Sequence, residues 1–488
     1  MNLEKHNLIQ LLRTLSNSEW KEFEKFTASP FFNKGRNYIP LLKILKKFHP
    51  SFESPEFTTE NIYSKLYPEK KYKESVLNSM FSRLYIIGEE YLIQIALEKS
   101  KTNVKDTLIM TELRSRGVTL KVNSLVENSL VHFENKKFSS FDFENLKSLK
   151  EQVYFLHQIN NEREKYDSAS GEVMIYFIYH FITDILFMDS GARSNKIYWD
   201  SDYDKGYVAQ ILSNINFEEI MKLVKKNDPK NFLPINIYYL AYKASRFPEN
   251  DDSYYELKDL FFKNMHKFEP DFKRLIIYDL WNNCISRNLM GKENFNRESF
   301  EIRKKIIEEN LFPTISKYMR ISEFRSSFIS ALNVGEFEWA ENFSVNYLYL
   351  IHPKFRNDVS NFCKARIAYE KGSYDEALEY SGKVRFNQIT FKLDIKNLLS
   401  KIYFETDSTE PLYSLLNTYY QLLNNAGSKD VNFILRHRNF VRHLKKLVDI
   451  KCNDYDSAEL MFLKKNIQDD NVSNKSWLLK HVEKLIAS

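Results

Sequence analysis

Two ten-residue segments near the C-terminal end of the chain repeat one pattern of residue types, and this repetition constrains the fold more than any other feature. The segments read VGEFEWAENF (334–343) and KGSYDEALEY (371–380). Each contains a glycine, an aromatic residue two positions later, an alanine five positions later and an aromatic residue eight positions later. The positions are Gly335, Phe337, Ala340 and Phe343 in the first segment, and Gly372, Tyr374, Ala377 and Tyr380 in the second.

Each of these positions has a physical role in a pair of packed helices. A glycine in a turn adopts backbone angles that other residues resist. An alanine lets two helices approach closely, and aromatic rings fill the space to the next pair. One helical pair cannot bury its own apolar face, whereas about three stacked pairs can. The pattern therefore predicts that these eight residues pack a stacked array of helical hairpins.

The scarcity of glycine agrees with a helical fold. The chain of 488 residues contains 11 glycines, whereas the usual share of ~7% would give roughly 34. Tight β-hairpin turns need residues that tolerate a positive φ angle, and glycine does this most easily. Apolar residues recur with helical spacing along most of the chain, and strand-like alternation is rare. We therefore predict an all-α protein.

The C-terminal segments resemble tetratricopeptide repeats. Units of that family have about 34 residues and form a helix–turn–helix with an early Trp-x-x-Leu-Gly-x-x-Tyr and a later Ala-x-x-x-Phe pattern. The resemblance covers residues 317–425, with Phe324, Leu399 and Tyr403 at first-helix positions, and is closest at 372–384. The whole chain also resembles a group of long helical proteins from Bacteroidetes-type bacteria that has no assigned activity.

The length of the chain favours several structural parts, since single cores stop growing beyond ~250–300 residues. A polar segment, EKSKTNVKD, indicates a boundary near residue 100. We predict a small N-terminal helical domain (1–100), an irregular helical array (101–316), and tetratricopeptide-like repeats that end in a capping helix (317–488). The resemblance implies that the repeats form a curved solenoid.

The resemblance also implies a peptide-binding groove, because the first helix of each tetratricopeptide pair lines a concave face. Carried over by position, the predicted groove set is Arg325, Phe362, Arg366, Tyr369, Asn397 and Lys401. Three cations beside two aromatic rings suit an acidic or carboxylate-ended peptide. The alternative is that these cations only keep the groove soluble.

We therefore expect a non-enzymatic scaffold or adaptor that binds protein or peptide segments. The alternative hypothesis is a nucleic-acid-associated regulator with an N-terminal helix-turn-helix and a partner-sensing array. The basic residues that surround its turn are Lys65, Lys70, Lys71, Lys73 and Arg83. The net charge of +6 is too small to indicate nucleic acid on its own.

Motifs of several enzyme classes are missing from the sequence. The two nearest glycines, Gly372 and Gly382, are ten positions apart, so no G-x-G-x-x-G, Walker loop or G-x-S-x-G elbow occurs. The sequence also lacks H-E-x-x-H. We expect no catalytic residues, no cofactor and no metal.

The acidic segment DSDYDKG (200–206) lies in a predicted loop over residues 189–206 and resembles the start of a calcium loop. An EF-hand needs glycine at the sixth position and a bidentate glutamate at the twelfth. Lys205 and Ile211 occupy these positions. We therefore favour a solvated acidic loop over a calcium site.

Cysteine spacing and hydropathy bear on the location of the protein. Cys284, Cys363 and Cys452 are far apart and fit neither a disulfide framework nor a C-x-x-C pair, which indicates a reducing cytoplasm. The most apolar run, VMIYFIYHFITDILFM (173–188), is shorter than the ~20 residues of a membrane span and contains His180. We expect a helix buried among other helices, and no membrane association.

Overall fold

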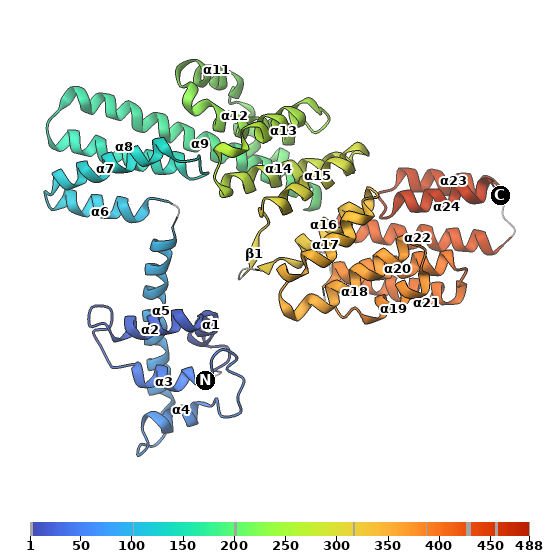
Figure 1. The fold of residues 1–488 in the computed structure, drawn as a ribbon, viewed down its shortest axis with the longest axis horizontal. Coiled ribbons are helices and arrows are strands. Elements are labelled where there is room, and N and C mark those ends of the chain that lie inside the picture. Colours follow the sequence, from blue (N-terminus) through green and yellow to red (C-terminus); the bar gives the residue numbers. More distant parts are fainter. Residues whose placement is uncertain are drawn as a thin grey trace. The chain divides into compact units, whose positions relative to one another are not determined.

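The structure is a computed structural model that describes residues 3–100, 102–199, 203–315, 318–386, 388–425, 431–453 and 457–487. The described residues form α-helices α1 to α24, three short 3₁₀ helices and one two-stranded hairpin (Figure 1). This confirms the prediction of an all-α protein. Contacts divide the chain into unit 1 (residues 1–134 and 141–176) and unit 2 (residues 135–140 and 177–488). The predicted boundaries at residues 100 and 316 stay predictions.

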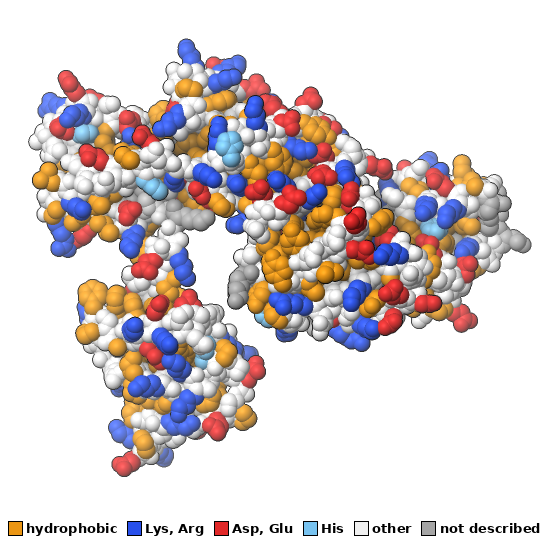
Figure 2. All heavy atoms as spheres, in the orientation of Figure 1, with side chains coloured by type: hydrophobic (Ala, Val, Ile, Leu, Met, Phe, Trp, Pro, Cys, Tyr) orange, Lys and Arg blue, Asp and Glu red, His pale blue; other side chains and the backbone are white. Residues whose placement is uncertain are grey.

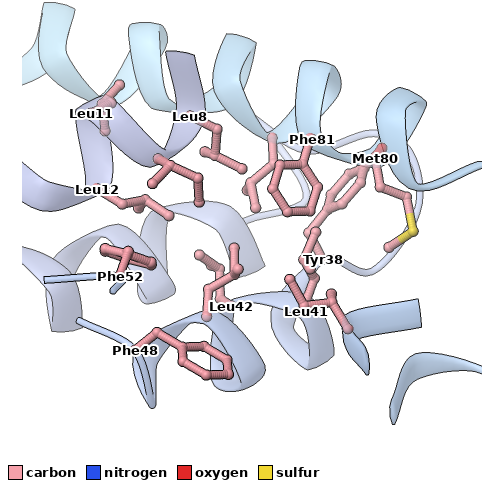
Figure 3. Packing of buried hydrophobic residues seen from close by; sticks show 14 of the residues in the cluster. Leu8, Leu11, Leu12, Tyr38, Leu41, Leu42, Phe48, Phe52, Met80 and Phe81 are labelled. Atoms are coloured by element: carbon pink, nitrogen blue, oxygen red, sulfur yellow. The ribbon is translucent and has the colours of Figure 1, made fainter. Parts of the chain in front are cut away.

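Unit 1 begins with five helices around one apolar cluster, shown in Figure 3. The helices are α1 (Asn7–Thr14), α2 (Asn17–Ala28), α3 (Ile39–Lys46), α4 (Thr59–Leu66) and α5 (Glu74–Lys99). Leu8, Leu42 and Phe81 are fully buried in this cluster. A capping box starts α2, because the Ser16 hydroxyl accepts from the Glu19 amide at 3.2 Å while the Glu19 carboxylate accepts from the Ser16 amide at 2.9 Å.

A second apolar cluster in unit 1 joins the next three helices. They are α6 (Val104–Ser115), α7 (Thr119–Asn135) and α8 (Asp142–Ile159). Met110, Val122 and Leu149 form the buried centre of this cluster, one residue from each helix. Each helix therefore covers an apolar face that its neighbours leave exposed.

The long helix α9 (Arg163–Trp199) differs from the sequence analysis in two ways. The predicted loop is wrong for residues 189–199, which continue the helix, because the polar residue Ser190 is bonded inside unit 2. Its hydroxyl lies 2.6 Å from the Ser245 hydroxyl and donates to the Asp279 carboxylate. A buried polar residue that finds such partners does not need a loop.

The apolar run 173–188 is helical but not buried among other helices, because neighbouring helices cover only part of the circumference of α9. Met174, Phe177 and Met188 are 58%, 56% and 64% exposed. By length and composition, Arg163–Ser194 is the one stretch among the described residues that is long and apolar enough to cross a membrane. The expected cytoplasmic location and lack of membrane association stay predictions.

Unit 2 contains most of the chain and all of its short strands among the described residues. Its elements after α9 are η1 (Tyr203–Lys205), α10 (Tyr207–Ser213), α11 (Phe217–Asn227), α12 (Pro229–Arg246), α13 (Asp252–Asn264), η2 (Met265–Lys267), α14 (Pro270–Leu289), α15 (Asn294–Glu308), β1 (Thr314–Ile315), β2 (Tyr318–Met319), α16 (Ile321–Asn333), α17 (Phe337–Asn346), η3 (Leu348–Leu350), α18 (Pro353–Glu370), α19 (Tyr374–Lys383), α20 (Ile389–Glu405), α21 (Thr409–Asn425), α22 (Val431–Cys452), α23 (Ser457–Asp469) and α24 (Lys475–Ala487). Consecutive helices pack as pairs, among them α14 with α15 and α18 with α19, and α18 also packs on α20.

The eight residues of the repeated pattern lie at two of these paired helices. Gly335 and Gly372 have φ angles of +79° and +78° in the turns before α17 and α19. Ala340 and Ala377 are fully buried between helices, and Phe343 is buried beside them. Tyr374 and Tyr380 pack against the buried cluster around Ala377. Phe337 contributes less packing, because it is 42% exposed.

Substitution of the two turn glycines tests the backbone part of this description. Gly335→Ala and Gly372→Ala should each lower the free energy of unfolding by about 1 kcal/mol, because an L-residue resists a positive φ angle. Steric overlap does not contribute, since a Cβ atom built at either glycine meets nothing within 4 Å. Urea unfolding followed by circular dichroism measures the change.

A matched control lies in the same hairpin. Gly382 is a residue of α19, has no positive φ angle and likewise has open space around a built Cβ atom. Gly382→Ala should stabilise the protein by about 0.5–1 kcal/mol, because alanine is the better helix former. Equal effects at all three glycines would contradict the assignment of the turns.

Candidate functional site

The predicted groove residues lie on α16, α18 and α20, and most of them are buried. The buried members, each with less than a tenth of its surface exposed, are Phe362, Arg366, Tyr369, Asn397 and Lys401. Phe362 packs against the Phe391 ring at 5.2 Å, and Asn397 accepts a hydrogen bond from the Tyr419 hydroxyl at 2.8 Å. Phe362 and Asn397 therefore join helices to one another, whereas Arg366 pairs with Glu370 on its own helix at 3.6 Å. The peptide contacts of the set stay a prediction.

Arg325, the remaining member of the groove set, is held by a carboxylate of the chain. Its Nη2 atom donates to Asp394 Oδ1 at 2.5 Å, and its Nε atom donates to the other oxygen. Burial alone would lower the pKa of Arg325, but the adjacent Asp394 carboxylate raises it. The bidentate pair links α16 to α20, so binding of an acidic peptide here would compete with an internal partner.

A cluster of polar and aromatic residues surrounds Glu405, at the C-terminal end of α20. Its carboxylate accepts hydrogen bonds from the Tyr369 hydroxyl, the Tyr374 hydroxyl and Trp477 Nε1, each at 2.9 Å. The His481 ring lies within 3.3 Å of the same carboxylate. Burial would raise the pKa of Glu405, but these hydrogen bonds outweigh it and lower the pKa. The cluster fastens α24 to α18, α19 and α20.

Lys401 lies beside this cluster. Among the described residues, no acceptor lies within hydrogen-bond distance of its Nζ atom. Its Nζ atom is 5.9 Å from the centre of the Tyr369 ring and 5.7 Å from that of Trp477. Burial, and then the charge of Arg366, lower the pKa of Lys401 to about 7. The amine is therefore partly neutral near neutral pH, so Lys401 attracts an acidic ligand less strongly than an exposed lysine would.

The sequence analysis did not identify Glu405 or Trp477 as site residues. Trp477 lies near the C-terminal end of the part for which a capping helix is predicted, but no spacing rule relates it to a carboxylate 72 positions earlier. Their contact depends on how α24 returns to α20. Only the tertiary structure contains that information.

A different site is a hollow of about 490 Å³ where α16, α18 and α20 begin. Its described lining residues are Tyr318, Met319, Arg320, Ile321, Ser322, His352, Phe355 and Gln388. Arg320, His352 and Gln388 are the N-cap residues of the three helices. The N-terminal ends of α16, α18 and α20, each the first helix of a consecutive pair, therefore lie at this hollow.

The walls of this hollow combine aromatic rings with hydrogen-bond donors. The Tyr318 and His352 rings meet edge to face at 4.9 Å, and Phe355 lies 6.2 Å from His352. The amide of Lys354 donates to Nδ1 of His352 at 3.3 Å, so a neutral His352 ring carries its proton on Nε2. The first amides of a helix lack intrahelical acceptors and carry partial positive charge. With the exposed Arg320, this arrangement favours an anionic group that is joined to an apolar one.

The basic residues of the alternative DNA-binding hypothesis surround α4 and α5. Lys65 pairs with Glu56 at 3.8 Å, and Lys70 lies 5.3 Å from the centre of the Tyr67 ring. On the face drawn in Figure 2, basic and acidic side chains are interspersed over both units. DNA binding stays a prediction.

The acidic segment of the calcium hypothesis falls largely outside the described residues. Asp200, Asp202 and the side chain of Asp204 are not among them. In the described part of the chain, no three His, Cys, Asp or Glu side chains are grouped so that they could hold a metal ion.

Comparison with protein-family models, with curated proteins and with solved structures finds no match to this chain. The molecule is an all-α protein in which paired helices pack in succession. The resemblance to tetratricopeptide repeats rests on the residues quoted from the sequence.

Glu405→Gln tests the cluster that fastens α24. At pH 7 this variant should lose about 2 kcal/mol of unfolding free energy, because hydrogen bonds to a charged acceptor are stronger than those to an amide. The pKa of Glu405 is lowered in the fold, so its contribution is present above the ordinary carboxyl pKa and disappears as the pH falls through the folded-state pKa. The difference between variant and parent should therefore shrink towards pH 3.

Glu376, an exposed residue of α19, provides the matched control. Glu376→Gln should change the unfolding free energy by less than about 0.5 kcal/mol at any of these pH values. A pH-independent loss in Glu405→Gln would contradict the charge-dependent role of Glu405.

Proposed function

We propose that the C-terminal helical pairs form a curved, tetratricopeptide-like solenoid and that the protein is a non-enzymatic scaffold that binds a segment of another protein. The supporting observation is the hollow at which α16, α18 and α20 begin. In a stack of helical hairpins, all first helices start on the same edge. A hollow lined by three successive N-cap residues is the arrangement expected of such an edge.

The chemistry of the hollow favours the free C-terminus of a partner protein with an apolar last residue. The rings of Tyr318 and Phe355 would contact the apolar side chain, whose burial contributes about 1.5–3 kcal/mol. Arg320 and the first amides of α16 and α20 would receive the carboxylate, because α18 begins with Pro353 and the amide of Lys354 is already bonded to His352. A preformed hollow on packed helices loses little entropy when it binds such a segment.

In this proposal the predicted groove residues have a supporting role. Arg325 is paired with Asp394, and Lys401 is buried beside Tyr369 and Trp477. These contacts hold the first helices in the register that forms the hollow. The partner therefore binds at the edge of the array rather than along the groove set.

Immobilised peptides that differ only at the C-terminus test the proposal. Peptides with a free carboxylate and a leucine, isoleucine or phenylalanine as the last residue should bind, whereas the same peptides with a C-terminal amide should bind at least about tenfold more weakly, as expected for a lost charge-assisted contact. Arg320→Glu should abolish the preference for the carboxylate. Phe355→Ala should weaken binding of all apolar last residues.

Lys480→Glu is the matched control, since it makes the same charge reversal at an exposed position of α24. This variant should keep the carboxylate preference of the parent protein. If no peptide distinguishes carboxylate from amide, or if Arg320→Glu binds like the parent, the proposed site is wrong.

A further inference from the structure

A second hollow, wholly within unit 2, lies between α9, α10 and the end of α12. Its volume is about 370 Å³, within the range of small-molecule sites. Its described lining residues are Arg193, Ala209, Gln210, Ser213, Arg246 and Phe247. Two guanidinium groups thus line one hollow, and none of these described lining residues is a carboxylate.

Arg246, the last residue of α12, is the most informative side chain in this hollow. Its Nη1 atom is buried and has no hydrogen-bond partner among the described residues. The guanidinium carbon lies 5.6 Å from the centre of the Tyr242 ring and 6.0 Å from that of Phe247. A buried donor without an acceptor costs free energy, so we expect a bound ligand to supply an acceptor for Arg246.

Arg193 carries the second guanidinium group of the hollow, and contacts with Asp189 and Tyr203 fix its orientation. Its Nε atom donates to Asp189 Oδ2 at 2.7 Å, and its guanidinium carbon lies 5.6 Å from the centre of the Tyr203 ring. The Tyr203 hydroxyl donates to the other oxygen of Asp189 at 2.9 Å. Because Asp189 is fully buried, it orients Arg193 without being one of the residues that line the hollow.

The tyrosines near the two arginines add no negative charge at neutral pH. Burial, and then the hydrogen bond to Asp189, raise the pKa of Tyr203 to about 12. Burial also raises the pKa of Tyr242, although Arg246 opposes this effect. The hollow therefore presents cationic, planar donors beside neutral rings, and the planar fork of arginine matches the oxygens of phosphate.

We propose that this hollow binds the phosphate group of a small phosphate monoester, with Arg246 as the main contact and Arg193 as the second. The charge of Arg193 is shared with Asp189, so Arg246 supplies most of the positive charge, and the two planar forks together offer several N–H donors to the phosphate oxygens. The hydroxyl of Ser213 is a further polar group at the wall, and Phe247 gives a flat apolar surface for the organic part of the ester. The site is independent of the peptide-binding site proposed above.

Isothermal titration of the full-length protein with phenyl phosphate, inorganic phosphate and phenol tests the inference. Phenyl phosphate should bind more tightly than inorganic phosphate, and phenol should not bind measurably. Arg246→Gln should weaken phenyl phosphate binding by about tenfold or more, as expected when a charge-assisted contact is lost. Arg246→Lys keeps the positive charge but not the planar guanidinium group. Its affinity for phenyl phosphate should lie between those of the parent protein and Arg246→Gln.

Two further variants make the result interpretable. Phe247→Ala should weaken phenyl phosphate binding and leave inorganic phosphate unchanged, which separates an organic ester from free phosphate as the ligand. Arg116→Gln, at an exposed arginine paired with Glu112 on α6, should bind like the parent. Arg246→Gln and Arg246→Lys that fold, as circular dichroism reports, and bind phenyl phosphate like the parent would overturn the inference.

Discussion

The fold depends on one constraint: a helical hairpin of this size has an apolar face that it cannot bury alone. Ala340 and Ala377 are fully buried, and Tyr374 and Tyr380 pack against the cluster that contains Ala377. The cluster around Ala377 contains buried residues of α18, α19 and α20, so these three helices share one apolar core. The same constraint explains why the hollow at the start of α16, α18 and α20 is built from three helices rather than from one loop.

Apolar packing sets the distance between the helices, whereas buried polar contacts set their register. Arg303 on α15 is almost fully buried, lies 3.5 Å from the centre of the Trp281 ring on α14 and pairs with Glu323 on α16. The Tyr278 hydroxyl donates to Glu323 at 2.7 Å. An unpartnered buried charge is costly, so these contacts oppose any slip of one helix past the next. Arg325 with Asp394, and Glu405 with Trp477, act in the same way further along the chain.

Local patterns were sufficient for some features and failed for others. Gly335 and Gly372 have positive φ angles, which agrees with the turn that a glycine permits, while the repeat to which they were assigned stays a prediction. The loop predicted over residues 189–206 is wrong for residues 189–199, because the partners of Ser190, Ser245 and Asp279, come from helices far along the chain. The groove set was carried over by position from a resemblance, which cannot foresee internal partners such as Asp394.

The sequence by itself determined the all-α class, and its glycines mark the turns before α17 and α19. These properties depend on residue periodicity and on steric size, which act over one or two turns of helix. The tertiary structure decided which cations are engaged by the chain, such as Arg325, and which, such as Arg246, have a buried donor with no partner among the described residues. It did so because charge and hydrogen bonding are satisfied between residues whose separation in sequence carries no information about their separation in space.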